Sequence, residues 1–282
     1  KAEQFFFEEY QLNYQIHCYD KPIICLANGY VMGGGVGLMA GASHRVVTES
    51  TRLAMPEITI GLFPDVGSTV FLNQMPYNLG FFFALTGMQL NANDTLFCKL
   101  ADYALEWKQA KALIKNLQQV NWEEDTEANH LLVDQQLKEL AANTQTMQAS
   151  NIKANLGVLE DTCRNTSLCE IIASIEAYDD NTWLLKAKSL LKAGSPLSSL
   201  AIYEQLKRFR YTDLQTCFLS ELILATNMVR LPEFAEGVRA LLIDKDKNPQ
   251  WTYKHYSDIS SSVIEKLFSA PWPENPLSKK FE

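Results

Sequence analysis

The 282-residue sequence predicts an α/β fold that is followed by a helical region. Short apolar segments with β-branched residues alternate with helical segments over residues 1–105. From Trp107 onward, glycine becomes sparse and apolar residues recur at helical spacing. We therefore divide the chain into an α/β core over 1–105, a helical region over 106–243, and an irregular tail rich in Pro and Trp over 244–282.

The first elements follow from periodicity and from Pro and Gly positions. Residues 3–19 predict an amphipathic helix. The residues expected on its buried face are Phe5, Phe6, Tyr10, Leu12 and Ile16. Ile23–Ala27 is predicted to be a buried strand. Gly33–Ala42 is predicted to be a helix, and its small and apolar residues are typical of a buried helix. Between them, Asn28-Gly29 fits either a tight hairpin or a bend.

The remaining elements alternate and then become helical. Further strands are expected over 45–48, 52–55 and 101–105, with helical segments over 68–75 and 79–86. A helix through Cys98 is expected to be capped by Asn91 or Asn93. The later candidate helices cover 107–120, 126–142, 151–162, 168–178, 180–193, 196–209, 212–229 and 232–242. Pro196 and Pro232 suit the first position of a helix.

Composition limits the classes of partner. A net charge of −8 makes nucleic acid unfavourable as a bulk partner. The apolar run Val31–Ala42 is too short and too rich in glycine to span a bilayer, so we expect no membrane partner. The charged, aromatic start does not resemble a signal peptide. The sequence has no initiating Met, which is compatible with a piece of a longer chain. Six scattered cysteines without CxxC spacing are expected to be reduced thiols.

Three consecutive glycines, Gly33, Gly34 and Gly35, begin the helix predicted over 33–42. A helix N-terminus presents unpaired N–H donors and the positive end of the helix dipole. Such a donor, aimed at a developing oxyanion, contributes about 3 kcal/mol to catalysis. The same glycines would also allow close helix–strand packing, and their spacing leaves both roles open. A G-x-G-x-x-A match over 35–40 is weak evidence for dinucleotide binding, because the strands around it are too short for repeated βαβ units.

Two acids, Glu57 and Asp65, flank the apolar segment 58–63 in a loop rich in Pro and Gly. Partial burial would raise the pKa of the Glu57 carboxyl toward the range of a general base, although a helix N-cap or a surface acid also fits. Asp65 also fits an ordinary turn. The pair, together with the glycine donors, suggests carbonyl chemistry. Glu8 and Glu9 fit a solvated helix face.

Other common chemistries lack their motifs. The histidines at 17, 44, 130 and 255 have no metal-ligand spacing, so we expect no metal site. There is no G-x-S-x-G elbow for a serine nucleophile and no P-loop.

The segment ANGYVMGGGVGLMAGASHRVVTESTRLAMPEITIGLFPDVG resembles the crotonase (enoyl-CoA hydratase/isomerase) superfamily, and most closely its 3-hydroxyisobutyryl-CoA hydrolase branch. The similarity continues through FFFALTGMQLNANDTLFCKLADYAL, SPLSSLAIYEQLKR and EGVRALLIDKDKNPQW, and MPEITIGLFPDVG is specific to that branch. It implies a spiral core of ββα units followed by helices. It also places further strands, and the loop that supplies a second oxyanion N–H, ahead of Lys1.

The resemblance also implies site residues. Gly34 matches the position whose N–H forms half of the oxyanion hole for the thioester carbonyl, with Gly33 and Gly35 beside it as substrate-binding residues. Glu57 matches the catalytic glutamate, and Glu9 matches a glutamate that contacts substrate.

Two positions separate hydrolysis from hydration in this resemblance. Asp65 matches the second acid of the hydrolase, where hydratases carry glycine. Gly37 stands where hydratases carry a second glutamate. The implied reaction is hydrolysis of a β-hydroxyacyl-CoA thioester, with 3-hydroxyisobutyryl-CoA in valine catabolism as the leading candidate. The alternatives are an enoyl-CoA hydratase/isomerase and a non-catalytic acyl-CoA-binding protein.

The resemblance implies acyl-CoA as the partner and no cofactor other than the coenzyme A of the substrate. We expect a cytoplasmic location, or the mitochondrial matrix if the source is eukaryotic. The helical C-terminal region often mediates trimerisation in the superfamily, so a homo-oligomer is compatible with the sequence. The altered C-terminal region of the hydrolase branch leaves the oligomeric state open.

Overall fold

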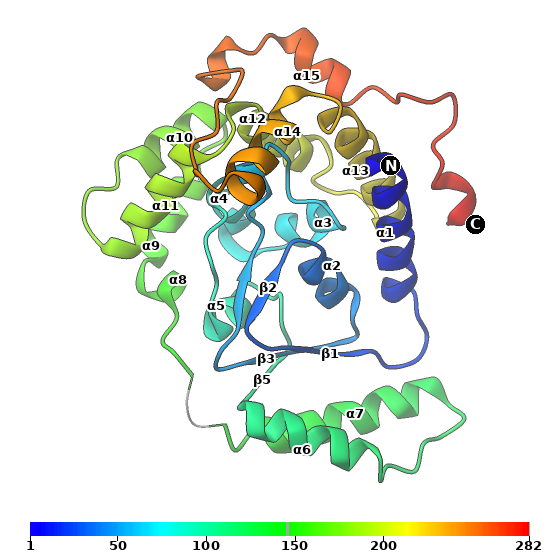
Figure 1. The fold of residues 1–282 in the computed structure, drawn as a ribbon. Helices are drawn as coiled ribbons and strands as arrows, with labels where there is room; N and C mark the ends of the chain where they lie inside the picture. The colour runs from blue at the N-terminus through cyan, green and yellow to red at the C-terminus, as the bar shows by residue number, and fades with distance from the viewer. Residues whose placement is uncertain (145–146, 282) are drawn as a thin grey trace. The chain divides into compact units, whose positions relative to one another are not determined.

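The computed structural model describes residues 1–144 and 147–281. These residues form two compact units, whose elements are labelled in Figure 1 and which we describe separately. Unit 1 contains Lys1–Tyr14, Met55–Met88 and Gly157–Glu282. Unit 2 contains Gln15–Ala54 and Gln89–Leu156.

Unit 2 holds two small parallel sheets. The first has the order β1-β3-β5, formed by β1 (Ile24–Ala27), β3 (His44–Thr48) and β5 (Tyr103–Leu105). Ile24 lies opposite His44 in this sheet. The second sheet pairs β2 (Tyr30–Met32) with β4 (Arg52–Ala54). Successive strands therefore alternate between the sheets, and α2 (Gly34–Gly41) connects β2 to β3 (Figure 1). This ββα arrangement agrees with the predicted α/β fold.

The step from β1 to β2 is a bend between two sheets and not a hairpin. Gly29 has a φ of 74°, in the left-handed region that glycine adopts without steric cost. Its carbonyl oxygen accepts a hydrogen bond from the N–H of Arg52 at 2.8 Å. This bend allows the chain to leave the first sheet and enter the second, which resolves the two possibilities that Asn28-Gly29 left open.

Unit 2 contains five helices among its described residues, and two of them pack against its first sheet. The five are α2, α5 (Ala92–Phe97), α6 (Trp107–Leu117), α7 (Thr126–Ala141) and α8 (Asn151–Ala154). α6 and α7 lie side by side, as Figure 1 shows. Their apolar faces form a buried cluster with the sheet, consisting of Val46, Leu105, Ala110, Leu113, Val133 and Leu137. Asn91 caps α5, as one of the two predicted alternatives, by accepting a hydrogen bond from the N–H of Asp94.

Unit 1 is helical. Its α-helices are most of α1 (Ala2–His17), α3 (Ser68–Asn73), α4 (Leu79–Thr86), α9 (Leu156–Cys163), α10 (Leu168–Glu176), α11 (Thr182–Ala193), α12 (Pro196–Arg208), α13 (Leu214–Met228), α14 (Pro232–Val238) and α15 (Ser261–Leu267). Shorter turns are η1 (Glu57–Ile60), η2 (Pro76–Asn78), η3 (Arg239–Ile243), η4 (Tyr256–Asp258) and η5 (Ser278–Lys280). Ser195 caps α12, and Pro196 occupies the start of this helix, as predicted.

Several expectations about individual elements were wrong. On α1, Phe5 and Leu12 are 58% and 50% exposed, whereas Phe6, Tyr10 and Asn13 are buried. The buried residues follow i, i+4, i+7 spacing, and Phe5 and Leu12 lie outside that narrower stripe. The predicted helix over 151–162 is interrupted at Asn155, whose φ of −116° is not helical.

Two further segments also differ from expectation. α2 is not buried throughout, because Leu38 is 45% exposed and Gly35 is exposed. The segment 244–282, expected to be irregular, contains α15, which buries Ile264 and Leu267 at i, i+3 spacing.

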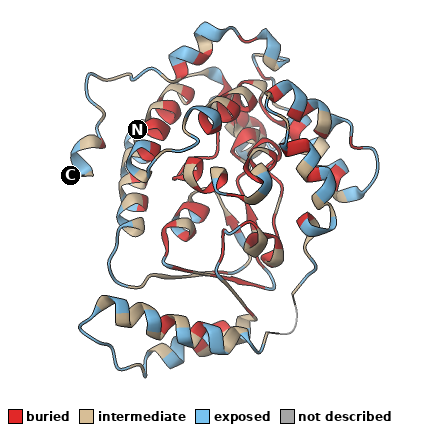
Figure 2. Ribbon diagram, turned by 180° about the vertical axis from the view of Figure 1, so that it is seen from behind, coloured by how far each residue is buried: buried red, intermediate tan, exposed pale blue. Residues whose placement is uncertain are grey.

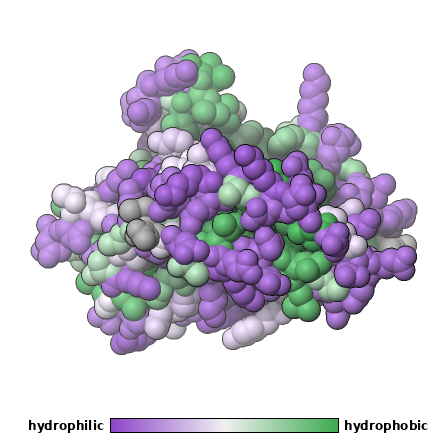
Figure 3. All heavy atoms as spheres, turned by 90° about the horizontal axis from the view of Figure 1, so that it is seen from below, coloured by the Kyte–Doolittle hydropathy of each residue, from purple (hydrophilic) through white to green (hydrophobic). Residues whose placement is uncertain are grey.

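The helices bury one side and expose the other, and one face of the molecule is mostly hydrophilic. Figure 2 shows buried residues along one side of many helices, with exposed residues on the other. The face in Figure 3 is mostly hydrophilic and is interrupted by hydrophobic patches. Within residues 1–144 and 147–281, no helix is both long and apolar enough to cross a membrane. All six cysteines are free thiols, as predicted.

Candidate active site

Unit 1 contains three of the predicted site residues close enough for their charges to interact: Glu9, Glu57 and Asp65. Glu9 lies on α1, Glu57 begins η1, and Asp65 lies in the loop before α3. The carboxylates of Glu57 and Asp65 are nearly buried, with 6% and 5% of these residues exposed. Glu9 is half-buried, so it is not the fully solvated acid that its sequence context favoured.

Burial and mutual repulsion disfavour negative charge on these acids. Burial, then the charge of Asp65, raises the pKa of Glu9 to about 7. Burial, then the charges of Asp65 and Glu9, raises the pKa of Glu57 well above its ordinary value. Burial raises the pKa of Asp65 to about 6, although a hydrogen bond from Tyr10 acts in the opposite direction. Negative charge on Asp65 therefore makes ionisation of Glu9 and Glu57 less favourable.

Close backbone packing fixes the turn that carries Glu57. The N–H of Ser195 donates to the carbonyl oxygen of Ile58 at 3.0 Å. α14 approaches so closely that a Cβ on Gly237 would lie 2.4 Å from the carbonyl carbon of Ile60. Such a distance leaves no room for a side chain at position 237. The glycine thus permits the contact that holds η1 in place.

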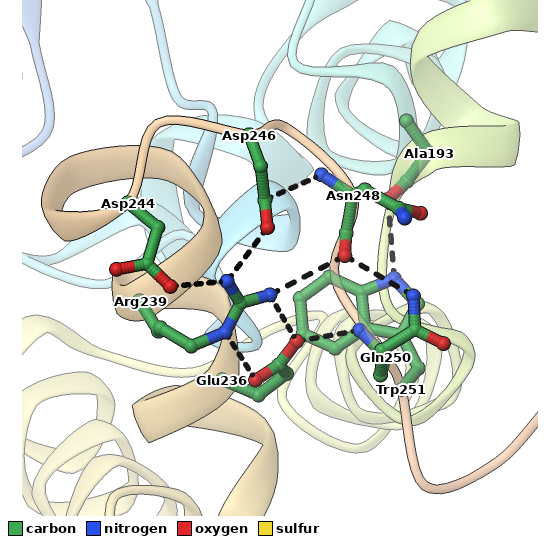
Figure 4. Close-up of polar contacts among 8 residues, drawn as sticks. All are labelled: Ala193, Glu236, Arg239, Asp244, Asp246, Asn248, Gln250 and Trp251. Carbon is green, nitrogen blue, oxygen red and sulfur yellow. Dashed lines mark hydrogen bonds and ion pairs between the residues drawn. The ribbon is translucent and has the colours of Figure 1, made fainter.

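Hydrogen bonds and ion pairs join the end of α14 to the loop that follows it, as Figure 4 shows. The guanidinium of Arg239 donates at 2.6–2.9 Å to three carboxylates, those of Glu236, Asp244 and Asp246. The N–H of Gln250 donates to Glu236 at 2.6 Å. The indole N–H of Trp251 then donates to the carbonyl oxygen of Ala193 at 3.2 Å, close in sequence to Ser195. These contacts connect the two segments that touch η1, namely α14 and the chain around Ser195.

A tight turn positions Asp65. Val66 has a φ of 57°, a left-handed conformation that costs a β-branched residue roughly 1–3 kcal/mol. Gly67 follows with a φ of 87°, and a Cβ there would lie 3.0 Å from the ring of Phe218. The turn ends at the N-terminus of α3. Surrounding contacts must stabilise this strained backbone.

The carboxylate of Glu221 supplies the main contacts to this turn. It accepts hydrogen bonds from the N–H of Gly67 at 2.7 Å, the N–H of Thr69 at 2.9 Å and the hydroxyl of Thr69 at 2.7 Å. Glu221 is completely buried on α13. Burial raises its pKa to about 7, while the Thr69 and Gly67 hydrogen bonds act in the opposite direction. Glu221 therefore stabilises the turn after Asp65 through hydrogen bonds to Gly67 and Thr69.

Tyr10 and Glu221 also contact the Asp65 loop, although no sequence pattern predicted either residue at this site. The hydroxyl of Tyr10 donates to Oδ2 of Asp65 at 2.6 Å. The available signal for Glu221 was a single acid within the apolar run Phe218–Ala225, on a helix otherwise suited to burial. No local signal indicated which segment either side chain would contact.

The predicted glycine site lies in unit 2, at the start of α2. Gly33 precedes the helix with a φ of 53° and a ψ of −126°, and Gly34 is its first residue. The first N–H groups of a helix have no partner within the helix. A Cβ on Gly35 would meet only Val31, at 3.9 Å, so packing within unit 2 does not require glycine there. At Gly41, by contrast, a Cβ would lie 2.9 Å from Ile16.

Within the described part of the chain, no cluster of three or more His, Cys, Asp or Glu side chains could hold a metal ion. His44 and His130 stack with ring centroids 5.5 Å apart, and His44 lies 3.5 Å from Asp134. These contacts join β3 to α7 within unit 2.

The ββα arrangement and the helical region define a crotonase-type α/β protein, as expected. A family model described as enoyl-CoA hydratase/isomerase matches residues 1–268. The chain belongs to this family.

Curated relatives include 3-hydroxyisobutyryl-CoA hydrolases from several organisms. The mitochondrial protein of Dictyostelium discoideum is 33% identical over 100% of this chain and 71% of its own length. The mitochondrial protein of Danio rerio is 34% identical over 95% of this chain and 69% of its own length. 3-Hydroxyisobutyryl-CoA hydrolase 1 of Arabidopsis thaliana is 31% identical over 97% of this chain and 72% of its own length.

Two similar crystal structures carry other names within the same fold. A carnitinyl-CoA dehydratase from Mycobacterium thermoresistibile has a TM-score of 0.85 and 28% identity, over 99% of this chain and 76% of that one. An enoyl-CoA hydratase from Rhodobacter sphaeroides has a TM-score of 0.80 and 28% identity, over 96% of this chain and 74% of that one. These similarities confirm the predicted fold class, while the roles of the individual site residues stay predictions.

Proposed function

We propose that the protein is an acyl-CoA thioester hydrolase that acts on a β-hydroxyacyl-CoA, with 3-hydroxyisobutyryl-CoA as its leading substrate. The names of the curated relatives support this reaction and its place in valine catabolism. The observation that carries the proposal is the cluster of Glu9, Glu57 and Asp65 in unit 1, three acids whose pKa values burial raises.

The proposed chemistry uses Glu57 to activate the attack on the thioester. As a general base, Glu57 takes a proton from water while the water oxygen bonds to the carbonyl carbon. The C–S bond then breaks, and the proton goes to the departing sulfur to give free coenzyme A and the hydroxy acid. As a nucleophile, the Glu57 carboxylate would instead bond to the carbonyl carbon while the C–S bond breaks, and the coenzyme A thiolate would leave and take a proton from solvent. Water would then hydrolyse the resulting acyl anhydride, which returns the Glu57 carboxylate and releases the hydroxy acid. A raised pKa makes the ionised Glu57 a stronger base in either case.

Asp65 and Glu9 are proposed to orient the substrate hydroxyl or the attacking water. Both are acids with pKa values raised toward neutrality, to about 6 and about 7. Such groups exchange protons readily under physiological conditions. The strained turn at Val66 and the Glu221 contacts hold Asp65 in a defined position for this role.

The glycines are proposed to stabilise the oxyanion. The N–H of Gly34, at the first position of α2, would polarise the thioester carbonyl, with Gly33 and Gly35 binding substrate beside it. The absence of a packing requirement at Gly35 supports this role over close helix packing.

The second candidate is an enoyl-CoA hydratase or dehydratase, which the names of the two similar crystal structures favour. Gly37 opposes it, because the glutamate expected of a hydratase at this position is replaced by a buried glycine. Incubation with 3-hydroxyisobutyryl-CoA and with crotonyl-CoA separates the two reactions. Release of free thiol from the first supports hydrolysis, and loss of enoyl absorbance with the second supports hydration. Tight binding of acyl-CoA without either change would indicate a non-catalytic binding protein.

The proposal includes no cofactor beyond the coenzyme A of the substrate. For a eukaryotic source, we propose the mitochondrial matrix as the location, supported by the names of the Dictyostelium and Danio relatives. For other sources we propose the cytoplasm. A homo-oligomer stays a prediction, to be tested by light scattering.

A further inference from the structure

Tyr10 is a completely buried tyrosine whose position is fixed by its neighbours in unit 1. Its ring lies between Phe6 of α1 and Phe218 of α13, with both centroids 5.8 Å away. α1 and α13 lie side by side (Figure 1). The hydroxyl donates to Oδ2 of Asp65 at 2.6 Å. A carboxylate can only accept, so this bond is strongest when Asp65 is ionised.

Glu57 has the opposite surroundings. Its Oε2 atom is buried and has no hydrogen-bond partner among the described residues. A buried oxygen without a donor disfavours the ionised form, whereas a charge-assisted hydrogen bond favours it. Since Glu57 and Asp65 are equally buried, the difference in hydrogen bonding decides which of them carries charge first.

The other titratable groups near Asp65 are acids as well. Glu9 is contributed by α1, Glu57 by η1 and Glu221 by α13. The thiol of Cys217, also on α13, contacts Glu221. In the part of the chain that the structure describes, no cation is among the groups that shift the pKa of Glu9, Glu57 or Asp65. Neutral donors, the Tyr10 hydroxyl first and the backbone N–H of Asp65 second, therefore stabilise a negative charge on Asp65.

We propose that Tyr10 is a positioning residue that makes Asp65 the first acid of the cluster to ionise and leaves the proton on Glu57 until later. The inference rests on the proposed function for its catalytic meaning, but the order of ionisation is a property of the protein alone. The charge on Asp65 then increases the basicity of Glu57.

The test replaces the hydroxyl alone, in Tyr10→Phe. Carboxyl-¹³C NMR of aspartate-labelled protein follows the titration of Asp65, assigned by its loss in Asp65→Asn. Without the hydrogen bond, the apparent pKa of Asp65 is expected to rise by about 1 to 2 units. An unchanged Asp65 titration in folded Tyr10→Phe overturns the proposal.

The matched control is Tyr178→Phe. Tyr178 is also buried and its hydroxyl is 2.8 Å from that of Thr162, away from the acids. This variant should leave the Asp65 titration unchanged. If Tyr10→Phe does not fold, 3-fluorotyrosine at position 10 provides the opposite perturbation: a more acidic phenol should lower the apparent pKa of Asp65, and no change would contradict the proposal. If the wild type releases no coenzyme A, the proposed function fails, while the NMR titration still decides the role of Tyr10.

Discussion

Glu221 lies behind the Asp65 turn, and Glu221→Gln tests whether its buried charge has the energetic effect that the structure implies. The carboxylate accepts hydrogen bonds from the backbone of Gly67, from the backbone and side chain of Thr69, and from the thiol of Cys217 at 3.4 Å. A glutamine retains one acceptor oxygen and places an NH₂ group against a donor. If the retained oxygen serves Thr69, the N–H of Gly67 loses its partner, at a cost of about 1–3 kcal/mol that does not depend on pH.

The pH dependence is the sharper prediction. Burial raises the pKa of Glu221 from 4.5 to about 7, so between these values the folded protein binds more protons than the unfolded chain. Stability from this group is therefore greatest below pH 4.5 and is lost as the pH rises through about 7. With 1.36 kcal/mol per pKa unit, the loss between about pH 5 and about pH 8 is on the order of 2–3 kcal/mol.

Urea unfolding followed by tryptophan fluorescence measures this loss. Across that pH range, the wild type should lose about 2–3 kcal/mol more stability than Glu221→Gln, because the variant has no proton to release there. Glu8→Gln, which removes an exposed carboxylate from α1, serves as the control and should keep the wild-type pH dependence. Equal pH dependence in the wild type and Glu221→Gln would refute the reasoning.

Two further predictions concern the turn that carries Glu57 and the role of metals. In Gly237→Ala, the new Cβ would lie 2.4 Å from the carbonyl carbon of Ile60, so η1 must shift; we expect a loss of about 1–3 kcal/mol of stability and a lower kcat. Gly157→Ala on α9 is its control, because a Cβ there meets nothing within 4 Å, and it should leave kcat unchanged. Thiol release should be unaffected by EDTA, since the proposed carbonyl activation uses backbone dipoles; inhibition that added Mg²⁺ or Zn²⁺ reverses would show that a metal takes part.

Local chemistry was enough to predict most elements of the fold. Asn91 and Ser195 cap helices where a short polar side chain precedes a helical run, and these signals lie within a few residues of the element they start. The alternation of short strands and helices in the first part of the chain likewise reflects local apolar patterns. The same loop context identified Glu57 and Asp65 as a pair before any contact was known.

What the sequence could not predict depends on contacts between distant segments. Glu221 supports a turn that lies 154 positions earlier in the chain, and no local pattern records such a pairing. Tyr10 looked like one apolar residue among several, because its hydroxyl partner is Asp65 on another element. The burial predicted for Phe5 and Leu12 was wrong for a related reason. Apolar residues occupy so wide an arc of α1 that the sequence does not indicate which part of the arc packs against other segments.

The central claim is that Glu57 and Asp65 carry out thioester hydrolysis. The most direct test compares release of coenzyme A from 3-hydroxyisobutyryl-CoA by the wild type, Glu57→Gln and Asp65→Asn, with Glu8→Gln as an exposed-acid control. We expect release by the wild type and the control, and losses of roughly 10²-fold or more in both site variants. An inactive wild type, or full activity in both site variants, would contradict the claim.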